Sequence, residues 1–202
     1  MTYTILSPFA VPIIKFKFKN HEKYIFNEIN RQENVPYEWA YSVNSSFPWI
    51  KDDDQFIKPN VRDSLISDVK ESIQEVFEDL KIPKEFYFQE FWYNIYHEDQ
   101  GQEMHNHLPF AHGRVPYWSG IYYNKNASPT KFARPDKIYT TQLFEGYKES
   151  LLGEFYFYSF HPDVSDGDII LFPPYLDHYV DEDDERKNNM RVTFSFNLIP
   201  VH

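Results

Sequence analysis

Met104-His105-Asn106-His107 opens the stretch of sequence that decides the fold of this chain, and Arg191-Val192-Thr193-Phe194-Ser195-Phe196-Asn197 closes it. Two imidazoles one residue apart, as in His105 and His107, lie on the same face of a regular strand. A third imidazole from a distant strand, such as that of His178, can complete three facial positions around one metal ion. Neutral imidazole binds iron, zinc, copper and nickel, so the pattern predicts a metal site.

The chain around these histidines has the pattern of a β-barrel. Short segments rich in aromatic and β-branched residues are separated by Gly, Pro and Asp turns, which predicts strands. These segments are residues 86–96, 117–124, 139–144, 155–160, 168–172, 177–180 and 191–199. Short strands at this spacing are typical of a barrel or a jelly roll. Residues 125–138 are predicted to be a loop near the mouth of that barrel.

The N-terminal part predicts a strand and helices that support the barrel. Residues 11–19 alternate apolar and polar side chains, and residues 21–32 can form a short helix. Residues 61–80 form the clearest helix, because their apolar side chains follow helical spacing between Pro59 and Pro83. The predicted fold class is therefore mainly β with flanking α-helices.

Length, composition and net charge narrow the range of possible functions. A length of 202 residues indicates one domain, and the 19 % of aromatic residues favour a β-rich fold. A net charge of −11 argues against a general nucleic-acid-binding protein, which would need a basic face. No cysteine is present, so a metal must be held by His, Asp or Glu. Because the chain shows neither a long apolar stretch nor a signal peptide, we expect a cytoplasmic protein that does not enter membranes.

Several motifs occur in an order that resembles a known family. They are Trp92-Tyr93-Asn94, His105-Asn106-His107-Leu108-Pro109, Ser119-Gly120-Ile121-Tyr122-Tyr123, Gly167 to Pro173, His178 and Arg191 to Asn197, with Pro8 to Ile13 as an N-terminal strand. In this order they resemble a bacterial and bacteriophage branch of the 2-oxoglutarate- and Fe(II)-dependent oxygenases. The resemblance implies a double-stranded β-helix of the jelly-roll or cupin-like kind. It also implies a single domain over 1–202, with supporting elements in 1–85 and the jelly-roll core in 86–202.

The resemblance implies that His105, His107 and His178 hold Fe(II). The wider superfamily more often has a carboxylate at the place of His107. Glu103 would share the face of His105 on a regular strand, so it is an alternative third ligand or a hydrogen-bond partner of the ligands. The sequence leaves this choice open.

The polar face of the last predicted strand supplies the second part of the site. Arg191 and Thr193 lie on it, and the resemblance implies that Arg191 pairs with the distal carboxylate of 2-oxoglutarate through a two-pronged contact. The simpler interpretation is that this face is exposed to solvent. Tyr123 is predicted to contact the same carboxylate, unless it is a core aromatic. Asn94 and Tyr96 are predicted cofactor or substrate contacts.

The implied function is that of an enzyme. It would be a dioxygenase that uses Fe(II), 2-oxoglutarate and O2, hydroxylates a C–H bond and releases succinate and CO2. One alternative is a cupin-type three-histidine dioxygenase without 2-oxoglutarate, in which Arg191 holds a substrate carboxylate. Another is a jelly-roll binding module without catalysis. The substrate, a small molecule or a peptide, is not readable from the sequence, and neither is the choice between a monomer and a homodimer.

Overall fold

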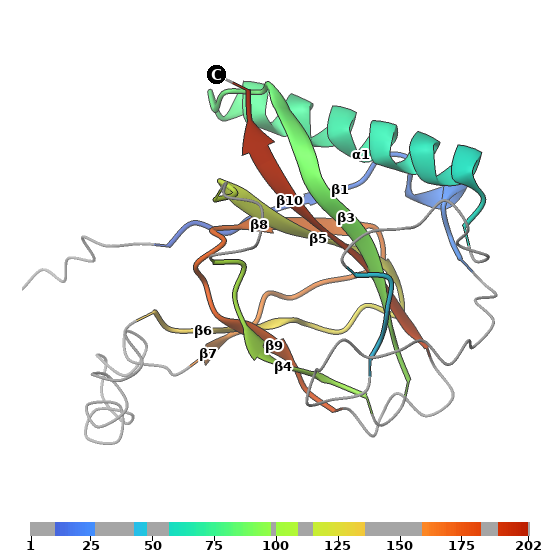
Figure 1. The fold of residues 1–202 in the computed structure, drawn as a ribbon, viewed down its shortest axis with the longest axis vertical. Coiled ribbons are helices and arrows are strands. Elements are labelled where there is room, and N and C mark those ends of the chain that lie inside the picture. The colour runs from blue at the N-terminus through green and yellow to red at the C-terminus, as the bar shows by residue number, and fades with distance from the viewer. Residues whose placement is uncertain are drawn as a thin grey trace, which may run out of the picture.

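Two antiparallel sheets face each other, and one long helix covers the outer side of the larger sheet (Figure 1). The computed structural model describes residues 11–26, 43–47, 57–97, 100–108, 115–135, 159–182 and 190–201. Among these residues, no helix is both long enough and apolar enough to span a membrane. The predicted β-rich jelly roll is confirmed.

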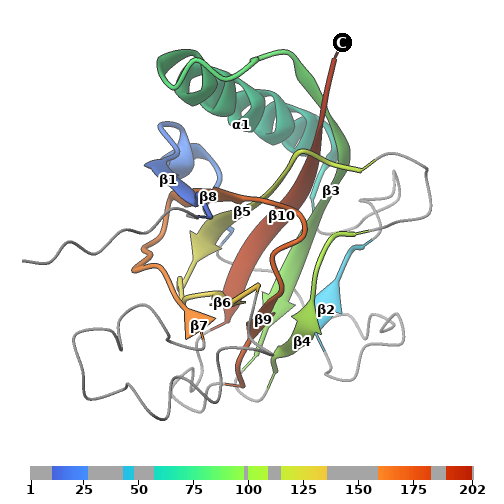
Figure 2. The same ribbon diagram turned by 90° about the vertical axis from the view of Figure 1, so that its left-hand side faces the viewer.

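The chain passes back and forth between the two sheets. The major sheet has the order β1 (Ile14–Lys17), β8 (Asp168–Phe172), β5 (Trp118–Lys125), β10 (Arg191–Pro200), β3 (Phe86–Tyr96) and β2 (Asn44–Ser45). The minor sheet has the order β4 (Gln102–His105), β9 (His178–Val180), β6 (Lys131–Ala133) and β7 (Ser159–Phe160). Consecutive strands such as β3 and β4, or β8 and β9, therefore lie in opposite layers (Figure 2).

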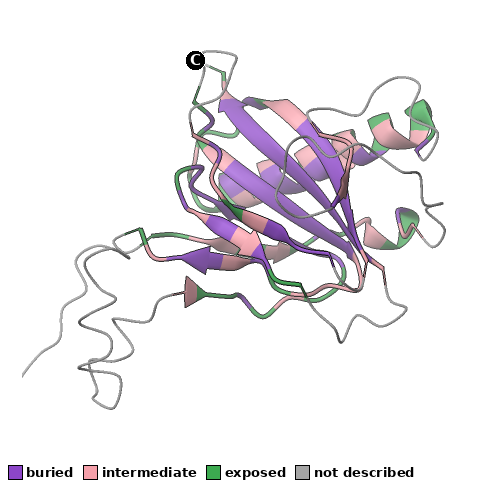
Figure 3. Cartoon of the chain, turned by 60° about the horizontal axis from the view of Figure 1, so that its bottom comes forward, coloured by how far each residue is buried: buried purple, intermediate pink, exposed green. Residues whose placement is uncertain are grey.

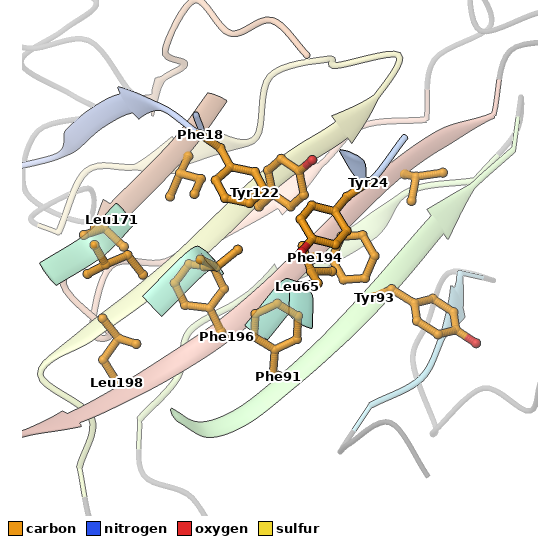
Figure 4. Close-up of a cluster of buried hydrophobic side chains, with 14 of the residues drawn as sticks. Phe18, Tyr24, Leu65, Phe91, Tyr93, Tyr122, Leu171, Phe194, Phe196 and Leu198 are labelled. Atoms are coloured by element: carbon orange, nitrogen blue, oxygen red, sulfur yellow. The ribbon is translucent and has the colours of Figure 1, made fainter. Parts of the chain in front are cut away.

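Helix α1 (Pro59–Asp79) covers the major sheet. It has proline in its first turn, where the missing N–H costs no hydrogen bond. Its buried face includes Leu65, Val69 and Ile73, which join one core cluster with aromatic side chains of β3, β5 and β10. Figure 4 shows part of this cluster. The predicted helix over 61–80 is confirmed.

Strand β10 separates the core from the space between the sheets. Its apolar side chains, including Phe194 and Phe196, belong to the helix-side core. The alternate residues Arg191, Thr193 and Ser195 point the other way, because successive side chains of a strand alternate between its faces. Both sets are buried, and the strand is buried along most of its length (Figure 3). The interpretation of the polar face as solvent-exposed is therefore wrong.

Some predicted elements differ from the observed ones. The segment 125–138 is not wholly a loop, because it contains β6, which pairs with β9 and β7. In the described part of 21–32 there is only a single 3-10 turn, His21–Lys23. The strand predicted at 139–144, most of that at 155–160 and the N-terminal motif from Pro8 to Ala10 lie outside the described residues.

Candidate metal centre

Three histidines converge between the sheets. His105 is the last residue of β4 and His178 the first of β9, and the two are direct partners across these antiparallel strands. His107 follows β4 in a loop, where its backbone N–H donates to the carbonyl oxygen of Pro174 at 2.8 Å. One ligand nitrogen from each ring lies within 4.8 Å of the other two.

The route by which His105 and His107 meet differs from the prediction. Strand β4 ends at His105, and its pairing with β9 is irregular between Gln102 and His105. The two imidazoles therefore do not lie along one regular strand face. The loop after β4 turns His107 back toward His105, with their ring centroids 5.6 Å apart.

Hydrogen bonds at Nδ1 fix the tautomers of His105 and His178. Nδ1 of His105 lies 2.8 Å from the carbonyl oxygen of Glu103, and Nδ1 of His178 lies 3.0 Å from that of Leu176. A carbonyl oxygen only accepts, so these Nδ1 atoms carry the protons and donate. Nε2 of each of these two rings therefore carries a lone pair, as a metal ligand requires. In His105 this nitrogen lies 3.5 Å from the amide nitrogen of Gln102, which can donate to it.

Burial keeps the three rings neutral. It lowers the pKa of His105, although the backbone contact with Glu103 partly opposes this shift. It also lowers the pKa of His107, to about 3, with the neighbouring His105 as a further cause. Burial, with His105 and His107 close by, holds the pKa of His178 well below its ordinary value. Neutral imidazoles are the form that binds metals, so protons compete little for this site at neutral pH.

Glu103 does not complete this cluster. Within the described part of the chain, the residues that could hold a metal together are His105, His107 and His178. Glu103 contributes its backbone carbonyl to the orientation of His105. The geometry thus favours the all-histidine set among the alternatives that the sequence left open.

Arg191 lies buried in the same cavity as the three histidines. Its exposed fraction is 1 %, and the cavity is lined by residues that include Arg191, Thr193 and all three imidazoles. Its Nη2 donates to Oγ1 of Thr130 at 3.1 Å, and the guanidinium carbon lies 4.6 Å from the ring centroid of Tyr96. Nε and Nη1 have no hydrogen-bond partner among the described residues.

Such a cation is costly unless an anion joins it. A buried charge that has no ion-pair partner and only part of its hydrogen bonds is disfavoured. Among the described residues no carboxylate forms an ion pair with Arg191. A small anion between Arg191 and the three histidines would accept from Nε and Nη1, so the chemistry of the residues present suits both a divalent metal and an anionic co-substrate.

The remaining predicted site residues surround this cavity. Asn94 and Tyr96 line it from β3. The Tyr96 hydroxyl donates to Oε1 of Gln102 at 2.7 Å, and the Asn94 amide donates to Ser195 at 3.3 Å. Tyr123 is fully buried with its ring centroid 5.5 Å from the Arg191 guanidinium carbon, so it contacts Arg191 from β5.

Sequence reasoning missed several residues of the site. Thr130 lies in the segment predicted as a loop, and nothing in its local sequence marks it. Ser119 and Asn197 belong to recognised motifs, yet their hydrogen bonds to Nδ1 of His107, at 2.7 and 2.8 Å, were not predicted. The position of Asn197 on the polar face of β10 was the available signal. Gln102 and Trp92 also line the cavity.

Comparison with known proteins identifies the family. Residues 90–197 match the model of the family described as "Putative 2OG-Fe(II) oxygenase". The chain belongs to this family of Fe(II)- and 2-oxoglutarate-dependent oxygenases. No curated protein sequence matches it.

Solved structures share the fold. HygX from Streptomyces hygroscopicus, with nickel and 2-oxoglutarate bound, matches with a TM-score of 0.61 and 13 % identity over 95 % of this chain and 84 % of that chain. A Pseudomonas putida prolyl-4-hydroxylase matches with a TM-score of 0.51 and 11 % identity over 83 % of this chain and 77 % of that chain. At these identities the likeness concerns the fold alone.

Proposed function

We propose that this protein is a dioxygenase that uses Fe(II), 2-oxoglutarate and O2 to hydroxylate a C–H bond of a small molecule or peptide, with release of succinate and CO2. One observation carries the proposal. Arg191 is buried, lacks a carboxylate partner among the described residues and shares a cavity with His105, His107 and His178. A metal site beside an unsatisfied cation suits a co-substrate that chelates metal at one end and carries a carboxylate at the other.

The three Nε2 atoms would hold the metal ion. Three neutral imidazoles leave Fe(II) with its full double charge, which a doubly negative 2-oxoglutarate neutralises. Bound Fe(II), together with 2-oxoglutarate and O2, supplies the oxidising chemistry that side chains cannot provide. His107 in place of a carboxylate therefore makes binding of the anion more favourable, since opposite charges attract strongly away from bulk water.

The chain's own residues orient the co-substrate and exclude water. Arg191 would bind the distal carboxylate by charge-assisted hydrogen bonds from its free N–H groups. The rings of Tyr96 and Tyr123 and the hydroxyl of Thr130 hold the guanidinium in place. Thr193 lines the same cavity and would assist the same carboxylate. A guanidinium fixed in advance loses little conformational entropy when the ligand binds.

Titration of 2-oxoglutarate tests the proposal directly. The protein is loaded with Fe(II) without oxygen, and 2-oxoglutarate is added while the visible charge-transfer band of an Fe(II)–keto-acid chelate is followed. We expect the band and calorimetric binding, and succinate once oxygen is admitted. Neither band nor heat at millimolar 2-oxoglutarate would contradict the proposal.

The all-histidine set supports a second candidate. A cupin-type dioxygenase with three histidines would need no 2-oxoglutarate, and Arg191 would then hold a carboxylate of the substrate itself. In that case the metal-loaded protein binds no 2-oxoglutarate and releases no succinate. A protein with neither metal nor 2-oxoglutarate binding would instead be a binding module.

A further inference from the structure

We infer that Glu90, acting through Asn197, fixes the tautomer of His107 and is a positioning residue for the third metal ligand. This inference rests on the proposed metal-binding role of His107. Glu90 does not line the cavity, and its carboxylate accepts a hydrogen bond from the Asn197 amide. Its effect passes through one amide side chain.

Three adjacent strands place the necessary groups in one row. Asn197 of β10 is the direct partner of Glu90 on β3 and of Ser119 on β5. Directly opposed residues on paired strands extend to the same face of the sheet. The ring of His107 meets this row, because both Ser119 Oγ and Asn197 Oδ1 lie within hydrogen-bond distance of its Nδ1.

A β-bulge begins beside the row. The pairing of β10 with β3 shifts between Asn197 and Leu198, where Leu198 opposes Phe88 and Gln89 is the extra residue. A bulge re-aims the side chains next to it. Glu90 pairs with Asn197 directly beside this irregularity, so its carboxylate stays opposite the Asn197 amide.

The direction of every hydrogen bond in the row follows from Glu90. Nδ2 of Asn197 donates to Oε2 of Glu90 at 2.6 Å. An ionised carboxylate can only accept, so the amide nitrogen must face Glu90 and the amide oxygen must face His107. The Ser119 hydroxyl donates its single hydrogen to the same amide oxygen at 2.7 Å, which leaves only its lone pairs toward His107.

Both groups that face Nδ1 of His107 are therefore acceptors. Nδ1 must carry the proton, and Nε2 must present a lone pair to the metal. A reversed amide would donate to Nδ1 and move the ring proton to Nε2, where it blocks coordination. In His105 and His178 the proton on Nδ1 is instead fixed by a backbone carbonyl oxygen, which cannot exchange places with a donor. At His107 the partners of Nδ1 are side chains, so the orientation of the Asn197 amide has to be set by a residue such as Glu90.

The test measures the tautomer and the metal affinity separately. Full-length protein with ¹⁵N-labelled histidine is studied metal-free by NMR, which distinguishes Nδ1–H from Nε2–H, and Ni(II) binding is measured by calorimetry. The variants are Glu90→Leu, Asn197→Leu and the double variant Glu90→Gln/Asn197→Asp, which keeps the net charge of the wild type. Glu85→Gln, an exposed carboxylate just before β3, is the matched control, and the melting temperature of each variant checks folding.

We expect the wild type to hold His107 purely as Nδ1–H. Glu90→Leu should give a mixture of tautomers and weaken Ni(II) binding roughly 10-fold, and Asn197→Leu should weaken it about 10- to 100-fold. The double variant should restore the single tautomer and bring affinity within about threefold of wild type. In it the amide introduced at position 90 donates to the carboxylate introduced at position 197, which still accepts from His107. Glu85→Gln should change neither measurement.

The inference is overturned if Glu90→Leu folds, keeps the single Nδ1–H tautomer and binds Ni(II) with wild-type affinity. It is equally overturned if wild-type His107 carries its proton on Nε2. A wild type that shows the Nδ1–H tautomer but binds no Ni(II) defeats the proposed function instead, while the hydrogen-bond chain itself is supported by the NMR result.

Discussion

Arg191 is the residue on which the assignment of the co-substrate depends. We predict that Arg191→Ala weakens 2-oxoglutarate binding by roughly 30-fold or more, since loss of one partner of a desolvated charge pair costs about 2–5 kcal/mol. Arg191→Lys should recover only part of the affinity, because an ammonium lacks the planar fork of a guanidinium.

Calorimetry with Ni(II)-loaded protein measures this effect. Ni(II) binding itself should stay nearly unchanged in Arg191→Ala. Arg62→Ala, which removes an arginine from α1, is the matched control and should bind 2-oxoglutarate like the wild type. Equal affinities in wild type and Arg191→Ala would show that the carboxylate is held elsewhere.

His107 carries the departure from the commoner ligand set. His107→Ala should abolish stoichiometric metal binding, because two imidazoles remain. His107→Asp should retain binding, since it restores a two-histidine, one-carboxylate set. Metal content after dialysis and calorimetry with Ni(II) measure both variants. Wild-type affinity in His107→Ala would place the third ligand outside the observed cluster.

At the scale of elements, the packing of β5 on β10 leaves no room beside Gly120. A Cβ atom added there would lie 2.1 Å from Cε2 of Phe196, and that ring is fully buried and stacked on Phe91. We predict that Gly120→Ala lowers the free energy of unfolding by about 1–3 kcal/mol, the usual cost of overpacking. Urea unfolding measures the change.

A double variant shows whether the Phe196 ring is the cause. Phe196→Leu removes the atoms in conflict at the cost of lost packing. Gly120→Ala combined with Phe196→Leu should therefore be less destabilised than the sum of the two single changes. Strict additivity would mean that the strain at Gly120 arises elsewhere.

The elements that could be predicted from the sequence are those whose hydrophobic pattern extends over several residues. The bounds of β3 and β8 agree with the prediction, and α1 differs by one or two residues at each end. Strands β2 and β6 were missed because two or three residues carry no readable period. Their pairing with β3 and β9 is set by the tertiary fold.

The same distinction holds for the site. The three histidines and Arg191 could be recognised from their spacing and from the order of the motifs, because imidazole and guanidinium groups are uncommon in strands. Thr130, Ser119 and Gln102 are common polar residues, and their roles depend on which strands become neighbours. Hydrogen-bond partners of this kind follow from register, which local sequence does not determine.

For the whole molecule, the metal would join the two layers. His105 and His178 belong to the minor sheet, while His107 is hydrogen-bonded to Ser119 and Asn197 of the major sheet. A ligand that binds only the folded state stabilises it by mass action, about 2.7 kcal/mol at a free concentration 100 times Kd. We predict that Ni(II) raises the free energy of unfolding by this order and that a chelator reverses the gain.

Chemical denaturation with and without Ni(II) measures this stabilisation. His178→Ala is the matched variant and should show no gain from Ni(II). A similar gain in both proteins would point to nonspecific binding of the metal outside the three-histidine cluster.

Because both faces of strand β10 are buried, the strand restricts how the sequence of this protein can evolve. Its side chains alternate between the core under α1 and the cavity of the site. Without a compensating bulge, losing or gaining one residue inside the strand would turn all side chains on one side of the change to the opposite face, so that either Arg191 or the phenylalanines would leave their places. Substitutions can accumulate along β10, whereas a change of its length by one residue requires a compensating β-bulge like the one beside Asn197. Natural relatives that retain the site should therefore carry their insertions and deletions outside 191–200, where added length leaves both faces in phase.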